Sequence, residues 1–157
     1  MTRVLDPANP DDVYRVALAM RERDVEEFTA VLEVDTRAAL AIEMCARFGK
    51  HPHCYVMRHE GQAVAVVGAL PIRPRSRSML FYATPDFPKV GLWATKLFIR
   101  EWLPAQKAAG VHRIECASLA GYEDMHRWLA VLGFNREMEM PNFGKRGETF
   151  VMFAWTG

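Results

Sequence analysis

Cysteine is scarce in this sequence, and a strong charge bias and long apolar runs are absent. The 157 residues include only three cysteines, Cys45, Cys54 and Cys116, which are widely spaced and odd in number. This pattern excludes a framework of paired disulfides and indicates a reducing compartment. No CxxC pair occurs, so a structural zinc site is not expected. Without disulfides or zinc, the chain must rely on a hydrophobic core, for which its length is sufficient.

The charges nearly cancel, with a formal net charge of +1. No overall field therefore favours nucleic acid or an acidic membrane as a partner. The one basic cluster, Arg73-Pro-Arg-Ser-Arg77, is predicted to be a solvated loop. Neither a run of about 18 apolar residues nor an apolar stretch of signal-peptide length after Met1 is present. We expect no membrane partner and a cytoplasmic location.

Half of the residues are apolar and a quarter are charged, as in ordinary globular proteins. Residues 1–157 are expected to form a single domain. The elements expected in the first half are a strand at 3–6, helices capped by Asp11 or Asp12, by Asp24, and by Asp35 or Thr36, and strands at 53–59 and 62–70. The third of these helices should turn Ala39, Ile42, Cys45 and Ala46 inward.

In the second half, strands alternate with helices. Pro104 should kink a long helix that ends at Gly110. The expected elements are strands at 78–84 and 111–118 around that helix, a helix at 122–132, and strands at 134–140 and 148–155. Hairpins together with a parallel crossover predict an α/β (α+β) fold, with a twisted, mixed, mostly antiparallel sheet and helices on both faces.

This order of elements resembles the Gcn5-related N-acetyltransferase (GNAT) superfamily. The matching residues are Thr84-Pro-Asp-Phe87, Gly91 before the long helix with Leu97, and Trp128-Leu-Ala-Val-Leu-Gly-Phe134. The resemblance implies a GNAT-like fold that uses acetyl-CoA as cosubstrate. It also implies acyl transfer by direct attack of a primary amine, carried by a small molecule or a protein.

A narrower resemblance concerns small acetyltransferase-like proteins of short-tailed bacteriophages, among them an internal virion protein. It is carried by Arg21-Glu-Arg-Asp24 with Glu27, by Leu80-Phe-Tyr-Ala-Thr-Pro85 and by Gly144-Lys-Arg-Gly147. It implies a phage-encoded protein located in the host cytoplasm or in the virion.

The resemblance places the cosubstrate at the end of the strand 78–84 and the start of the next helix. Backbone N–H groups of Tyr82, Ala83 or Thr84 would polarise the thioester oxygen. The pyrophosphate loop of the family, Gln/Arg-x-x-Gly-x-Gly/Ala, corresponds to Pro88-Lys-Val-Gly91-Leu-Trp93, in which only Gly91 is kept. Two interpretations stay open. Either the N–H groups of Lys89, Val90, Gly91, Leu92, Trp93 and Ala94 and the Lys89 ammonium bind CoA, or the segment is a plain strand-to-helix turn with Trp93 in the core.

Leu129 stands where the family usually has its acidic tyrosine, so the acid must be sought elsewhere. Tyr122 and His126, one helical turn apart, are the candidates. Glu115 is the candidate base, with Ile114 and Cys116 on the opposite face of its strand. For all three residues, ordinary packing or solvation is the alternative.

Two functions therefore remain open. The chain is an acyl-CoA-dependent N-acyltransferase, or it is a catalytically inactive GNAT-fold component of a phage virion or a binder of a host protein. Pro88, Trp93 and Leu129 favour the second hypothesis. His51, His53 and His59 lack a completing ligand pattern, so no metal is expected. An exposed edge among the late strands makes a homodimer possible.

Overall fold

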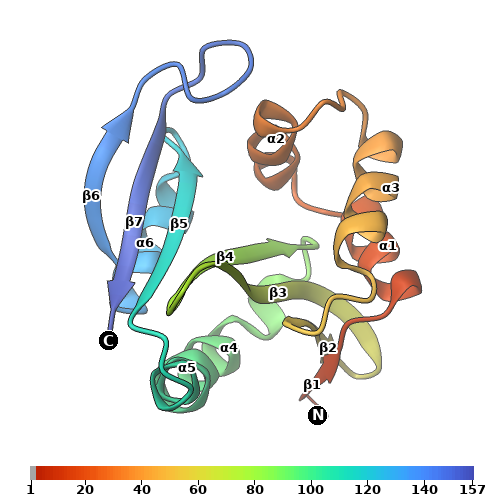
Figure 1. Ribbon diagram of the computed structural model, residues 1–157. Coiled ribbons are helices and arrows are strands. Elements are labelled where there is room, and N and C mark those ends of the chain that lie inside the picture. Colours follow the sequence, from red (N-terminus) through yellow and green to blue (C-terminus); the bar gives the residue numbers. More distant parts are fainter. Residues whose placement is uncertain (1–2) are drawn as a thin grey trace. The chain divides into compact units, whose positions relative to one another are not determined.

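The computed structural model describes residues 3–157, and the chain divides into two compact units. Unit 1 contains the residues up to Leu70 together with Leu80–Val90, and unit 2 contains Pro71–Met79 and Gly91–Gly157. The strands are hydrogen-bonded in the order β1-β2-β3-β4-β5-β7-β6, mostly antiparallel (Figure 1). Strands β3 and β4 each begin in one unit and end in the other. The predicted fold class, mixed α/β with a mostly antiparallel sheet, is confirmed.

Unit 1 begins with β1 (Arg3–Pro7) and α1 (Pro10–Leu18). The predicted cap of α1 at Asp11 or Asp12 is wrong, because Asn9 is the N-cap and its side chain accepts the N–H of Asp12. Pro10 fits the first helical turn, where its missing N–H costs nothing.

Helix α2 (Glu22–Val31) buries two acidic side chains. The sequence predicts Asp24 as its cap, but Arg21 occupies the cap position and Asp24, Glu27 and Ala30 are buried, while Val25 and Phe28 also pack against the core. The three buried residues recur every third position, so they lie on one side of the helix.

Helix α3 (Arg37–Phe48) is capped by Thr36, whose hydroxyl accepts the N–H of Ala39. Its predicted inward stripe is wrong by a rotation of the helix. The buried residues are Leu40, Ala41 and Met44, while Ile42 is exposed.

The core of unit 1 lies between these helices and one face of the sheet. Strands β2 (Cys54–His59), β3 (Gln62–Arg73) and β4 (Ser76–Ala83) extend the sheet from β1. The buried cluster joins α1 and α3 to Cys54, Val56, Val66, Leu80 and Tyr82. The Tyr82 hydroxyl donates to the carbonyl of Val13, which satisfies the one polar atom of this large buried side chain.

Unit 2 contains the start of β4, β5 (Arg113–Leu119), β6 (Asn135–Met140) and β7 (Phe150–Thr156). β7 pairs antiparallel with both β5 and β6. The parallel ladder of β4 and β5 runs only from Ser76–Arg113 to Ser78–Glu115, although both strands continue further.

The long predicted helix of unit 2 is divided as Pro104 requires. α4 (Gly91–Leu97) passes into a π-helical turn at Phe98–Trp102, and α5 (Leu103–Ala108) follows. Proline lacks an N–H and clashes with the carbonyl four residues earlier, so a widened turn before it relieves the conflict. α6 (Glu123–Val131) buries Met125 and Leu129 and ends before Gly133, which has a positive φ.

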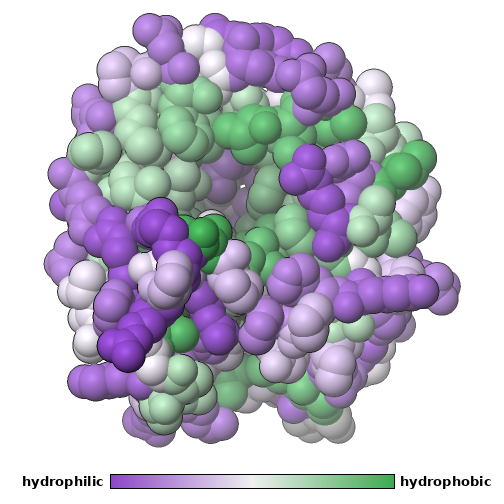
Figure 2. All heavy atoms as spheres, viewed as in Figure 1, coloured by the Kyte–Doolittle hydropathy of each residue, from purple (hydrophilic) through white to green (hydrophobic). Residues whose placement is uncertain are grey.

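Hydrophilic side chains cover much of the visible face of the molecule, with hydrophobic ones between them (Figure 2). The large apolar side chains most exposed to solvent include Leu92, Ile42 and Val131. Within residues 3–157, no helix has both the length and the apolar character needed to cross a membrane.

Candidate functional site

The end of β4 and the loop after it, residues 82–90, form the part of the predicted cosubstrate site that lies in unit 1. The resemblance requires free backbone N–H groups there. The loop contains a turn and a short 3-10 helix at Phe87–Lys89, and Val90 follows as a buried residue. Its usefulness as an anion site depends on where each N–H points.

The N–H of Ala83 is already bound by a carboxylate. Along a strand, the N–H groups of successive residues point to opposite edges. The N–H of Thr84 donates to the carbonyl of Val64 at the β3 edge, 2.9 Å away. At the other edge, the N–H of Ala83 donates to Oδ2 of Asp24 at 3.0 Å, in a buried environment. Two of the three predicted thioester donors therefore have acceptors within unit 1.

The start of α2 satisfies the carbonyl of Ala83 as well. The N–H of Arg21 donates to this carbonyl at 2.9 Å. Residues 21–24 thus supply both a donor and an acceptor to Ala83, as a neighbouring strand would. We call this arrangement of Arg21, Asp24 and Ala83 the α2 clasp.

The guanidinium of Arg21 holds the Asp24 carboxylate in place. Its Nε donates to Oδ2 of Asp24 at 3.0 Å and its second nitrogen donates to Oδ1 at 3.1 Å. The same guanidinium lies 5.7 Å from the ring centroid of Phe81 and 5.5 Å from that of Phe87. The carboxylate is only 1% exposed. Its charge is balanced by two fork-like hydrogen bonds and one backbone N–H, as a buried charge requires.

The remaining N–H groups of the loop are also used. The N–H of Asp86 donates to the hydroxyl of Thr84 at 3.3 Å, and that of Phe87 donates to the Thr84 carbonyl at 3.0 Å. The N–H of Lys89 donates to the carbonyl of Asp86, and the N–H of Val90 to that of Phe87. Residues 85 and 88 are prolines and have no N–H. From residue 83 to residue 90, every backbone N–H has an acceptor in the chain.

Free donors begin only with α4, in unit 2. The first N–H groups of any helix lack an intrahelical acceptor. Leu92 in this first turn is 71% exposed, and Trp93 is half-buried rather than in the core. The ammonium of Lys89, in unit 1, pairs with the carboxylate of Asp86 at 3.1 Å.

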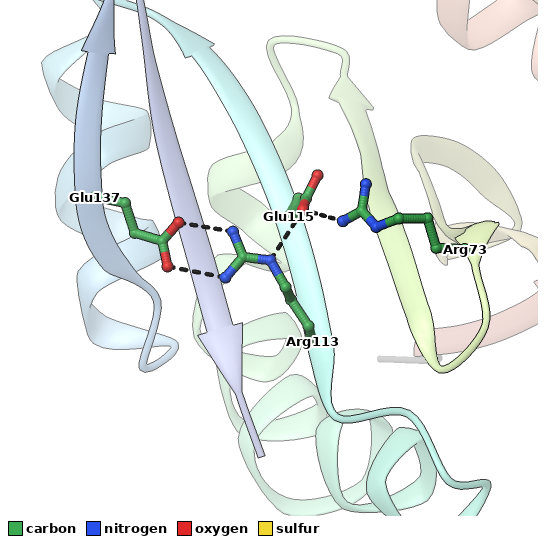
Figure 3. Close-up of polar contacts among 4 residues, drawn as sticks. All are labelled: Arg73, Arg113, Glu115 and Glu137. Atoms are coloured by element: carbon green, nitrogen blue, oxygen red, sulfur yellow. Dashed lines mark hydrogen bonds and ion pairs between the residues drawn. The ribbon is translucent and has the colours of Figure 1, made fainter.

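Glu115, the predicted base, is held by two arginines of unit 2 (Figure 3). Nε of Arg113 donates to its Oε1 at 2.9 Å, and Arg73 at the end of β3 donates to the same oxygen. Arg113 also makes two hydrogen bonds to Glu137 on β6, at 2.9 and 2.6 Å. These arginines, Arg113 foremost, lower the pKa of Glu115 below its ordinary value. A carboxylate stabilised in this way is a weak base.

His126, a predicted acid, is neutral and packed within unit 2. Its Nε2 lies 3.1 Å from the carbonyl of Leu119, and its ring lies 4.9 Å from that of Phe153. A carbonyl only accepts, so Nε2 carries the proton. Burial lowers the pKa of His126, so the imidazole is a poor proton donor near neutral pH. Glu115 and His126 contact different residues.

Tyr122, the other predicted acid, is buried directly before α6, and Leu129, at the family's tyrosine position, is fully buried. Among the aromatic residues of unit 2, Phe98 and Trp102 are buried, whereas Trp128 is half-buried and donates its indole N–H to the hydroxyl of Thr95 at 2.9 Å.

The cysteines and histidines are the remaining candidates for chemistry. Cys54 and Cys116 are buried, and burial raises the pKa of the Cys54 thiol to about 11. The rings of His51 and His53 lie 5.8 Å apart. Within residues 3–157, no group of three or more His, Cys, Asp or Glu side chains is arranged to hold a metal ion.

Sequence reasoning missed the α2 clasp. It noted the residues Arg21, Asp24 and Glu27 but assigned Asp24 to a helix cap. The signal that could have identified the clasp is the spacing of Asp24, Glu27 and Ala30, which places two carboxylates on the buried side of α2. Acidic residues are almost never fully buried unless they are paired.

Solved structures with the same fold are acetyltransferases of the GNAT family. An acetyltransferase (GNAT family) from Bacillus anthracis matches with a TM-score of 0.73 and 13% identity, over 99% of this chain and 95% of that one. The ribosomal-protein-alanine N-acetyltransferase of Brucella melitensis matches with a TM-score of 0.68 and 21% identity, over 98% and 99%. The protein yncA of Salmonella typhimurium, solved with acetyl-CoA, matches with a TM-score of 0.66 and 17% identity, over 99% and 94%. No family model and no curated protein matches the sequence.

The chain therefore has the GNAT fold. An acyl-CoA held as the resemblance implies would need N–H groups that Asp24, Val64 and the turn at 84–90 already bind. To reach Ala83, a thioester oxygen would have to displace a carboxylate, which is the stronger acceptor, and leave that buried charge with one donor fewer. The residues present in unit 1 do not fit this cosubstrate.

Proposed function

We propose that this chain uses the GNAT fold to bind another protein and does not transfer acyl groups. The observation that carries the loss of acyl transfer is the hydrogen bond from the buried Ala83 N–H to the Asp24 carboxylate, at 3.0 Å. It occupies a donor that a thioester oxygen would require, and the rest of the segment 83–90 offers no replacement. The binding role is what the narrower resemblance to phage proteins implies.

The candidate catalytic residues support the same proposal. Glu115 is stabilised as a carboxylate by Arg113 and Arg73, which weakens it as a base. His126 is neutral and donates to a carbonyl. General acid–base catalysis needs groups whose pKa values lie near the working pH. The pKa values of Glu115 and His126 are both shifted away from neutral pH.

Acyl-CoA-dependent N-acyl transfer is the second candidate. Two observations favour it: Gly91 opens α4, whose first N–H groups resemble a helix-terminal anion site, and structural neighbours are named as N-acetyltransferases. Fold alone does not determine function. On this alternative, acetyl-CoA would be the cosubstrate and Glu115, Tyr122 and His126 would carry the proton transfers.

Calorimetric titration of the wild-type chain with acetyl-CoA separates the two candidates. We expect no saturable binding with a micromolar Kd, and no corresponding thermal stabilisation, because a ligand that binds only the native state must raise stability. Acetylation of a panel of amines, followed by mass spectrometry, should also be undetectable. Micromolar binding together with turnover would overturn the proposal.

The narrower resemblance suggests where such a binding protein acts. If the source is a short-tailed phage, we expect the chain in purified particles or in complex with a host protein in the infected cytoplasm. Mass spectrometry of purified particles and of tagged chain recovered from infected cells tests this. Absence from both would overturn the binding role, and the CoA titration would still decide whether the chain transfers acyl groups.

A further inference from the structure

A hollow lined by arginines lies beside the turn between β3 and β4, entirely within unit 2. Its volume is about 650 Å³, which is within the range of small-molecule sites. Its lining consists of residues 71, 73–77 and 109–111. Proline, alanine and valine form apolar walls, and Arg73, Arg75 and Arg77 supply the charge. None of the described side chains that line it is acidic.

The three arginines are not equally compensated. Arg73 forms an ion pair with Glu115. Arg77 donates to Oε1 of Gln106 on α5 at 2.9 Å, so its guanidinium is positioned by a neutral amide. The Arg75 side chain is exposed and has no ion-pair or hydrogen-bond partner among residues 3–157. Two positive charges therefore lack a neighbouring carboxylate.

The backbone places Arg75 at an unusual position. The turn consists of Pro74 and Arg75, and Arg75 has a φ of 60°. A turn with proline first and a positive φ second normally has glycine or asparagine at the second position. The carbonyl of Arg75 accepts the N–H of His112, which fixes the turn against the start of β5. The turn therefore holds a long cationic side chain at a position where glycine would be less strained.

From these features we propose that the hollow binds a phosphate monoester of a small organic molecule, with Arg75 and Arg77 holding the phosphoryl group. Guanidinium forks match phosphate oxygens in geometry and charge. The volume exceeds what a bare phosphate fills, and the apolar walls at Pro71, Pro74 and Val111 suit an organic body. Within residues 3–157, no carboxylate pairs with Arg75.

This inference does not rest on the proposed function, because no residue of the α2 clasp lines the hollow. It does bear on the CoA test, since CoA itself carries phosphates. Acetyl-CoA binding that is lost in Arg75→Gly would be attributed to the hollow. Acetyl-CoA binding that survives Arg75→Gly would count against the proposed function alone.

The test uses AMP, inorganic phosphate, adenosine and a hexaglutamate peptide as probes, by calorimetry of the full chain at low salt. AMP should bind at least about tenfold more tightly than phosphate or adenosine, because only AMP has both the anionic group and the body. Arg75→Gly should weaken AMP binding by about tenfold or more, the effect of losing a charge-assisted hydrogen bond. Glycine tolerates the positive φ, so this variant keeps the turn.

Arg77→Gln is the second variant and should weaken AMP binding to a similar degree. It decides the question if Arg75→Gly does not fold. Arg100→Gln is the matched control, because Arg100 is exposed, lies in the same unit and does not line the hollow. It should bind AMP as the wild type does. The inference is overturned if AMP and adenosine bind equally or not at all, if the peptide binds more tightly than AMP, or if the control loses as much affinity as the two variants.

Discussion

Substitution of Asp24 by alanine tests the α2 clasp through the stability of the chain. The carboxylate accepts the N–H of Ala83 at 3.0 Å and two hydrogen bonds from Arg21 at 3.0 and 3.1 Å. Its loss leaves a buried N–H unsatisfied, which costs about 1–3 kcal/mol. The Arg21 side chain is 26% exposed and can turn to water, so the loss of its pairing adds only about 1 kcal/mol. We expect Asp24→Ala to lower the free energy of unfolding by roughly 2–4 kcal/mol.

Urea unfolding at neutral pH measures this loss, and Asp124→Ala is the control. Asp124 also lies in the first turn of a helix and pairs with an arginine three positions away, but its side chain is 84% exposed. That pair should contribute no more than about 0.5 kcal/mol. Asp24→Asn keeps an acceptor for Ala83 and should lose less than Asp24→Ala. If Asp24→Ala and Asp124→Ala were equally stable, the clasp would not hold Ala83 and the reasoning would be refuted.

Three further predictions concern other parts of the chain. Glu115 has a pKa lowered from 4.5, so its ion pairs stabilise the fold above that pH and are lost as pH falls through the lower value. The stability gap between wild type and Glu115→Gln should therefore shrink on acidification, and a gap constant from pH 7 to pH 3 would contradict this. Burial lowers the pKa of His126 from 6.5, so NMR should show its imidazole protonating below that value, whereas titration above it would be inconsistent. Gly68→Ala places a Cβ 2.9 Å from both the Cys54 sulfur and the His53 carbonyl oxygen, so urea unfolding should show a loss of roughly 1–3 kcal/mol, and a neutral result would mean that the strands can separate.

Local chemistry made much of the fold predictable. Alternating and apolar runs placed the strands at 54–59, 62–73 and 150–156 to within a few residues, and Gly110 and Gly133 marked helix ends through their positive φ. Pro104 predicted the interruption of the long helix, because a proline distorts the preceding helical turn in any surroundings.

Tertiary contacts determined the helix caps and buried helix faces that the sequence did not predict. Asp24 is a good N-cap residue by type, but its carboxylate bonds to a strand 59 positions away. Ile42 is apolar enough for the core, yet Leu40 and Met44 take that place because α3 is oriented by its packing with α1 and the sheet. Charged side chains on a buried helix face contradict the apolar pattern on which helix predictions depend.

The structure of the basic run was predicted only in part. Arg73–Arg77 was predicted to be a solvated loop; Arg73, Pro74 and Arg75 are exposed, but the run contains two strand ends and a two-residue turn. The proline and the arginine-rich composition are typical of loops. The pairing of Ser76 with Arg113 and the bond from His112 to the Arg75 carbonyl make it part of the sheet.

Calorimetric titration of the Arg75→Gly chain with acetyl-CoA is the most direct test of the central claim, because this variant weakens any binding of the ligand by the hollow. With Asp24 on Ala83 and the loop N–H groups engaged, no binding should be measured at millimolar ligand. A saturable isotherm with a micromolar Kd would mean that the α2 clasp opens to the cosubstrate, and the account of a closed site would be wrong.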